Sequence, residues 1–152
     1  MQIDWVLLLW NFGAVMGFMI AVWALSVAIK NASIADTFWG FGFVVVAWIT
    51  FLGADGYLGR RLLITLLVTI WGLRLALHIG IRNWGKGEDR RYQDWRQQYG
   101  KRFWWVSLFT VFLLQGALLW VISLGAQVGQ WSPKPDRFIW PDWAGLLLWA
   151  VG

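Results

Sequence analysis

The sequence predicts an all-α integral membrane protein, a polytopic bundle of transmembrane helices. Of its 152 residues, 59% are hydrophobic and only 14% are charged, too few charges to cover the surface of a water-soluble domain of this length. Aromatic residues make up 18% of the chain and include 15 tryptophans, whose side chains concentrate where acyl chains meet lipid head groups. A bilayer is therefore the expected solvent.

Four hydrophobic runs are long enough to cross a bilayer, whose hydrocarbon core of about 30 Å needs roughly 20 helical residues. These runs are residues 4–29, 37–54, 62–81 and 103–126. A fifth run, residues 142–152, has about half that length. We expect it to be a truncated fifth transmembrane helix, so that residues 1–152 form the N-terminal part of a larger membrane domain; the alternative is a short amphipathic or re-entrant segment.

Positive charges predict the orientation of the bundle. Eight Lys or Arg residues lie at the end that holds residues 82–102, and four lie at the other end. The eight are Lys30, Arg82, Lys86, Arg90, Arg91, Arg96, Lys101 and Arg102. Loops rich in Lys and Arg stay in the cytoplasm, so we expect loop 82–102 to be cytoplasmic and the N-terminus to face outward.

Composition also excludes several kinds of site. The chain has no cysteine, which excludes disulfides, thiolate metal sites and thiol nucleophiles. Its one histidine, His78, cannot form a metal site alone, so we expect no metal. The net charge of +5 collects in one loop and is explained by membrane topology, so we expect no nucleic-acid partner.

Ionisable side chains at membrane depth need a partner or a function, because they are costly there. Arg74 and His78 lie inside the third run, and Asp36 lies beside the start of the second. Arg74, His78 and Arg82 are four residues apart and share a helix face. This face either holds an anion, such as a cofactor phosphate or a polar substrate head, or Arg74 pairs with Asp36 and locks two helices together.

Residues 82–100 are the most polar segment of the chain. Gly85 and Gly87 flank Lys86, and Glu88 and Asp89 precede aromatic residues at helical spacing, at positions 92, 95 and 99. We expect a short helix on the membrane surface in the cytoplasmic loop. A Gly-Lys-Gly turn can bind phosphate but is not the P-loop pattern. The alternative is a solvated loop whose charges only set the topology.

Small and polar residues inside the runs are expected to pack helices. Asn11 and Gln115 can form hydrogen bonds between helices. Gly13 and Gly17 have the spacing that permits two helices to approach closely.

Three strings in this order resemble the bacterial proteins grouped as domain of unknown function 1295. They are residues 31–40, 71–75 and 85–92, and Gly100 to Trp104 follows them. That family is placed in the steroid 5-alpha-reductase superfamily, with sterol reductases and, more distantly, isoprenylcysteine carboxyl methyltransferases. A bacterial member would lie in the inner membrane.

The resemblance implies a membrane enzyme that uses NADPH, bound from the cytoplasm, to reduce a carbon–carbon double bond in a lipid, sterol or isoprenoid-like substrate. With the charge pattern, it assigns cofactor binding to Arg74, Arg82, Lys86, Glu88, Asp89, Arg91 and Tyr92. The rim toward a hydrophobic substrate would be Asp36, Trp39, Trp71 and His78. Relatives carry much of the cofactor site in a C-terminal part without counterpart here, so we expect the chain to be inactive alone, and the catalytic residues stay unassigned.

Two other functions remain open. One is a methyltransferase that uses S-adenosylmethionine and resembles the isoprenylcysteine enzymes. The other is a non-catalytic membrane scaffold, in which the charges serve topology and packing. Neither the substrate nor the oligomeric state follows from the sequence.

Overall fold

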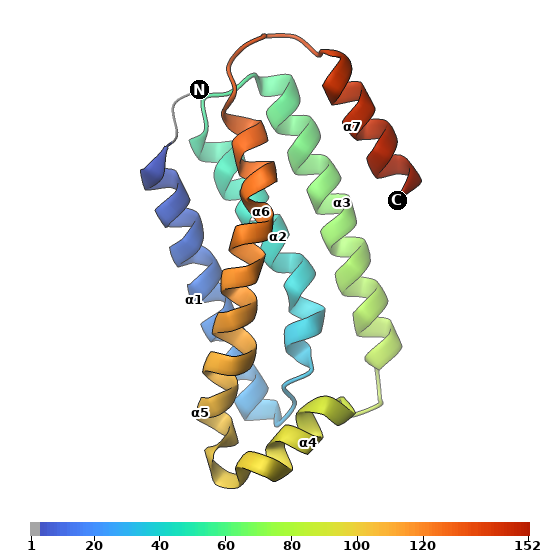
Figure 1. Ribbon diagram of the computed structural model, residues 1–152. Coiled ribbons are helices and arrows are strands. Elements are labelled where there is room, and N and C mark those ends of the chain that lie inside the picture. The colour runs from blue at the N-terminus through green and yellow to red at the C-terminus, as the bar shows by residue number, and fades with distance from the viewer. Residues whose placement is uncertain (1–3) are drawn as a thin grey trace.

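The computed structural model describes residues 4–152, which form helices and contain no strand (Figure 1). The elements are α1 (Trp5–Ile29), α2 (Ile34–Gly53), α3 (Leu58–Asn83), α4 (Arg90–Tyr99), the 3₁₀ turn η1 (Gly100–Arg102), α5 (Phe103–Ser107), the π-helical turn η2 (Leu108–Leu113), α6 (Leu114–Trp131) and α7 (Trp140–Val151). Four stretches are long and apolar enough to span a membrane: α1, α2, α3 and residues 90–131. The predicted fold class is confirmed, and the protein is an integral membrane protein.

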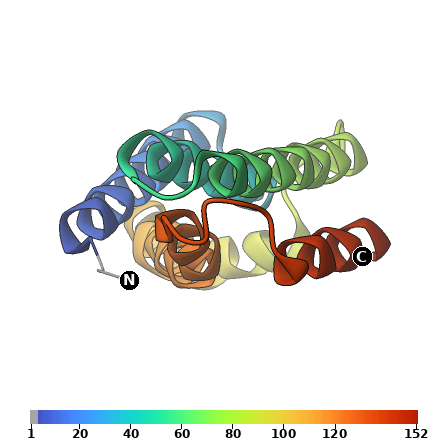
Figure 2. The same cartoon turned by 90° about the horizontal axis from the view of Figure 1, so that it is seen from above.

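The long helices run side by side, and α4 lies across one end of them (Figure 1). We call this end of the bundle the α4 end and the other the far end. In the view along the bundle, α1, α2 and α3 form one layer, and α6 and α7 lie on the same side of it (Figure 2). Helix α6 packs on all three helices of the layer, and α7 lies beside α3. The connection from α6 to α7 crosses the far end, whereas the connections at the α4 end belong to α1–α2 and α3–α4.

Two of the long helices begin before the hydrophobic runs from which they were predicted. Helix α2 starts at Ile34 instead of residue 37, and α3 starts at Leu58 instead of residue 62. Hydropathy marks only the part of a helix that lies in hydrocarbon, while the helix continues into the polar boundary. Asp36 consequently lies in the first turn of α2, where the positive end of the helix dipole favours a carboxylate.

Helices α2 and α3 meet at two glycines, Gly40 and Gly72. A Cβ atom built on Gly72 would lie 2.6 Å from the backbone oxygen of Gly40, and a Cβ on Gly40 would meet the backbone oxygen of Gly72. By contrast, Gly13 and Gly17 have nothing within 4 Å of an added Cβ. The expectation that these two glycines mediate close helix packing was therefore wrong, because they lie on exposed faces of α1.

The interior contains a buried polar layer as well as apolar side chains. Asn11 Nδ2 donates to Thr50 Oγ1 at 2.9 Å and to Gln127 Oε1 at 2.8 Å. All three side chains are fully buried, and they come from α1, α2 and α6. The prediction that Asn11 bonds between helices is confirmed, and we call these three residues the amide layer.

Between α5 and α6, the otherwise α-helical chain contains the π-helical turn, Leu108–Leu113. Gln115 follows directly after it. Its backbone oxygen accepts from Trp39 Nε1 at 3.3 Å, and its Nε2 donates to the Tyr92 hydroxyl at 3.5 Å. The expected hydrogen bonding of Gln115 between helices is thus confirmed.

Candidate functional site

The loop before α4 is attached to the turn between α1 and α2. The Glu88 carboxylate accepts from the backbone N–H of Ala32 at 2.7 Å and pairs with Arg96 at 2.8 Å. The backbone N–H of Asp89 donates to Ser33 Oγ at 2.6 Å. Two of the three strings that carry the family resemblance, more than 50 residues apart in the chain, are therefore in direct contact.

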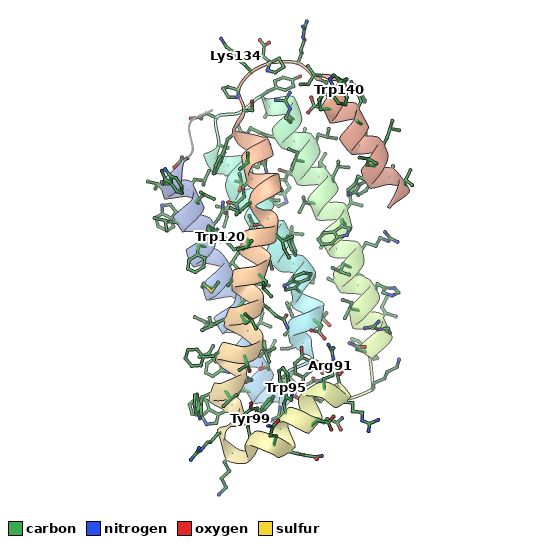
Figure 3. The ribbon with its side chains drawn as sticks, in the orientation of Figure 1. Arg91, Trp95, Tyr99, Trp120, Lys134 and Trp140 are labelled. Carbon is green, nitrogen blue, oxygen red and sulfur yellow. The ribbon has the colours of Figure 1, made fainter. Side chains whose placement is uncertain are left out.

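Asp36 makes the second attachment between α2 and α4. Its two carboxylate oxygens accept from Arg91 Nη2 at 3.0 Å and from the Tyr92 hydroxyl at 2.9 Å. Figure 3 shows Arg91 on α4 at this end of the bundle, far from Lys134. The pairing of Asp36 with Arg74 considered from the sequence does not occur, because Arg91 and Tyr92 hold this carboxylate. We call Asp36, Glu88, Arg91, Tyr92 and Arg96 the α4-end network.

Electrostatics keep the network in its charged, hydrogen-bonded form. Burial would raise the pKa of the Glu88 carboxyl, but hydrogen bonds from Arg96 and the Ala32 N–H outweigh it and lower that pKa below its usual value. Hydrogen bonds from Arg91 likewise lower the pKa of Asp89. Burial, and then the negative charge of Asp36, raise the pKa of the Tyr92 hydroxyl, so this phenol stays protonated and donates.

A cavity of about 300 Å³ opens beside this network, which we call the α4-end cavity. Its polar groups come from four helices: Asp36 from α2, Arg82 from α3, Arg91 from α4 and Gln115 from α6. Its apolar walls are Trp39, Ile79 and Leu118. Two guanidinium groups, one carboxylate and one amide thus face a space that is otherwise apolar.

A second hollow of about 250 Å³ lies farther along α3. It is lined by Trp71, Arg74, Leu75 and His78, and the side chains of Arg74 and His78 are exposed. The ring of Trp71 packs on Phe43 with centroids 5.2 Å apart, and Phe43 packs on Trp39 at 5.0 Å. This aromatic row joins a wall of the second hollow to a wall of the α4-end cavity.

The predicted site residues therefore divide into three groups. Asp36, Trp39, Arg82 and Arg91 come together at the α4-end cavity, whereas Trp71, Arg74 and His78 line the second hollow. Lys86, Glu88, Asp89 and Tyr92 line neither space. Lys86 is exposed, Asp89 caps α4 through the backbone N–H of Arg91, and the Glu88 oxygens are already occupied. Their assignment to a cofactor stays a prediction.

Sequence reasoning missed Arg96, Ser33 and the place of Gln115 in the site. Arg96 follows Glu88 by eight residues, a spacing for which no local helix rule predicts a pair. Gln115 was expected only to join helices, because nothing in the sequence shows that its face borders the same cavity as Arg82.

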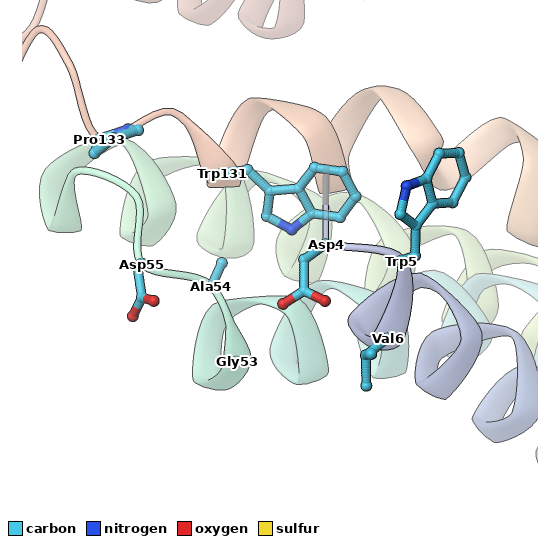
Figure 4. A pocket seen from close by; sticks show the side chains of 8 residues that line it. All are labelled: Asp4, Trp5, Val6, Gly53, Ala54, Asp55, Trp131 and Pro133. Carbon is cyan, nitrogen blue, oxygen red and sulfur yellow. The ribbon is translucent and has the colours of Figure 1, made fainter. Parts of the chain in front are cut away.

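Another hollow, of about 610 Å³, lies at the far end (Figure 4). Asp4, Asp55 and Trp131 contribute its polar groups, and none of the predicted site residues lines it. Asp4 already caps α1 by accepting from the backbone N–H of Leu7 at 2.9 Å. Among the described residues that line it, two are carboxylates and none is a cation, which does not suit a phosphate-bearing ligand, so volume alone does not make this hollow the better candidate.

Comparison with known proteins gave one result. A search of curated proteins and a search of solved structures each found no match. A family model described as a protein of unknown function (DUF1295) matches residues 22–152. This range contains the α4-end network and the residues that line the α4-end cavity and the second hollow. The chain accordingly belongs to the DUF1295 family of proteins of unknown function.

Proposed function

We propose that the protein acts in the NADPH-dependent reduction of a carbon–carbon double bond in a lipid, sterol or isoprenoid-like substrate, within the membrane. The main support for the proposal is the α4-end cavity, which is lined by the cationic side chains of Arg82 and Arg91 and by the apolar side chains of Trp39 and Leu118. The positive charges predict that this end faces the cytoplasm, where the cofactor is available.

The residues at the cavity fit part of such a cofactor. Arg82 and Arg91 are suited to phosphate oxygens, because a guanidinium presents its donors in a fork that matches an oxyanion. A volume of about 300 Å³ suits one end of a dinucleotide.

Each group at the cavity has a physical role in this proposal. Arg82 and Arg91 bind anionic oxygens, and Tyr92 positions Asp36 by donating to it. Trp39, Ile79 and Leu118 form the apolar wall of the space, against which the nonpolar part of a ligand can pack. When bound, NADPH supplies the hydride.

The test is binding of NADPH to the purified protein in mild detergent. Trp39 lines the cavity, so energy transfer from tryptophan to bound nicotinamide reports occupancy. Arg82→Gln should weaken NADPH binding about tenfold, which corresponds to about 1.4 kcal/mol. Arg102→Gln is the matched control, since Arg102 is an exposed arginine at the same end that lines neither hollow.

S-adenosylmethionine is the comparison ligand, because it is the cofactor of the alternative methyltransferase. Saturable binding of NADPH, weakened by Arg82→Gln and unaffected by Arg102→Gln, supports the reductase. Equal NADPH affinity in the two variants, or a thermal shift with S-adenosylmethionine only, would overturn it.

A further inference from the structure

Helix α3 carries arginines at three depths: Arg60, Arg74 and Arg82. With a rise of 1.5 Å per residue, Arg74 lies about 12 Å along the helix from Arg82 and about 21 Å from Arg60. An arginine side chain has six bonds of about 1.5 Å and reaches at most about 9 Å. The Arg74 guanidinium therefore remains within a hydrocarbon layer of about 30 Å if Arg60 and Arg82 mark its two boundaries.

Arg60 shows how this fold satisfies an arginine that it buries. Its guanidinium pairs with both oxygens of Asp142, at 2.7 and 3.1 Å, and donates to the backbone oxygens of Ser132 and Arg137. Within residues 4–152, no such ion pair or hydrogen bond is formed by the side chain of Arg74. A charge at this depth is costly unless it is paired with an opposite charge or with other polar groups, and Asp36 is already held by Arg91.

The residues around Arg74 indicate which kind of ligand could pair with it. Its hollow also contains His78 and the apolar side chains of Trp71 and Leu75, and no carboxylate lines it. One turn toward the far end, a groove of about 310 Å³ runs between α3 and α7 and is walled by Leu67, Val68, Leu146 and Trp149. A cationic hollow and an apolar groove thus follow one another along α3.

We propose that this face binds a single-chain lipid with a carboxylate head, held by Arg74 and His78, and with its chain in the groove between α3 and α7. A single carboxylate matches the single guanidinium, whereas a doubly charged phosphate would leave a negative charge uncompensated in hydrocarbon. The groove volume of about 310 Å³ holds about ten methylene-sized groups, if each takes roughly the 30 Å³ of one water molecule in the liquid, which is room for most of one chain and not for two.

This site is independent of the proposed reductase. It contains none of the residues of the α4-end cavity, and its binding is measured without NADPH. Failure of one proposal therefore leaves the other unchanged.

The experiment measures binding of tritiated palmitate to the protein in phosphatidylcholine nanodiscs. Palmitate should bind saturably, with an affinity at least tenfold lower in Arg74→Gln and unchanged in Arg102→Gln. Arg74→Lys keeps the charge but loses the planar fork, so we expect an intermediate affinity. Methyl palmitate, which lacks the charge, should compete at least tenfold less well than palmitate.

Photolabelling locates the chain and does not depend on the folding of a variant. Palmitate with a diazirine near the middle of its chain should label the wild-type groove at Leu67, Val68 or Leu146. Labelling only on α1, equal competition by methyl palmitate, or equal affinity in Arg74→Gln and Arg102→Gln would each overturn the proposal. Absence of saturable palmitate binding to the wild-type protein would do the same.

Discussion

The amide layer and the α4-end network join helices by different means. Asn11, Thr50 and Gln127 are neutral and fully buried between α1, α2 and α6, in the half of the bundle toward the far end. The network at the α4 end uses ion pairs instead, and its arginines are partly exposed: the side chain of Arg91 is 67% exposed and that of Arg96 is 39% exposed.

The difference follows from the cost of removing a charge from water. An amide buried in an apolar interior needs only its hydrogen bonds, whereas a buried ion loses several kcal/mol of hydration. Ion pairs are therefore expected at the two ends of the bundle, as between Arg91 and Asp36 and between Arg60 and Asp142, and uncharged polar groups between them. Arg74 departs from this rule, because it is a charge at depth without an intramolecular partner among the described residues.

The largest loss of stability is expected when Glu88, the most buried carboxylate of the α4-end network, is removed. Glu88→Ala leaves Arg96 and the Ala32 N–H without their acceptor, so we expect the free energy of unfolding to fall by about 3 kcal/mol. Unfolding by sodium dodecyl sulfate, followed by circular dichroism, measures it. Asp94→Ala on the exposed side of α4 is the control, and an equal loss in both variants would contradict the role of Glu88.

Acidification should destabilise the contacts at the α4 end and leave the amide layer unchanged. The folded-state pKa values of Glu88 and Asp89 are lowered, so the stability they contribute is present above their unfolded values, near 4, and is lost as the pH falls through the folded values. We expect the melting temperature to drop below about pH 4, and Glu88→Ala to reduce that drop. An unchanged drop in this variant would show that other groups carry it.

Substitutions in the amide layer should have a smaller effect that does not depend on pH. Gln127→Leu deprives Asn11 Nδ2 of one acceptor, which should cost about 1–2 kcal/mol. Adding Asn11→Leu removes the stranded donor as well, so the double variant should lose less than the sum of the two single variants. Additive losses would mean that the two side chains are not coupled.

The smallest effect is expected at the exposed arm of the network. Arg91→Gln removes an ion pair with Asp36 whose arginine is 67% exposed, and such pairs contribute about 0.2–1 kcal/mol. Tyr92 still donates to Asp36, so the melting temperature should hardly change. A loss as large as that of Glu88→Ala would show that exposure does not rank these pairs.

Hydropathy was sufficient to predict the long helices, because the cost of unsatisfied backbone groups in lipid allows little else for a long apolar run. It did not predict where they touch. Gly17 and Gly72 look alike in the sequence, but only Gly72 lies against another backbone, and this depends on which face of each helix packs inward.

The candidate site was predictable in its composition and not in its pairing. Asp36, Arg82 and Arg91 were selected because charges near apolar runs are rare, and the structure gathers them at one cavity. The pairing of Asp36 with Arg91, 55 residues away, follows from how α4 folds back across the bundle, for which no local rule exists. Likewise, nothing in residues 108–113 marks the π-helical turn.

The π-helical turn affects both the amide layer and the α4-end network. A π-helical turn contains one residue more than an α-helical turn, which changes the angular phase of the helix by about 100°. Deleting one residue between Leu108 and Leu113 would therefore turn α6 relative to α5 and α4, so that Gln115 could no longer face Tyr92 while Gln127 faces Asn11. The π-helical turn thus allows the two halves of α6 to make their separate contacts at the same time. A hydropathy profile of the shortened chain would hardly differ, although these contacts would be lost.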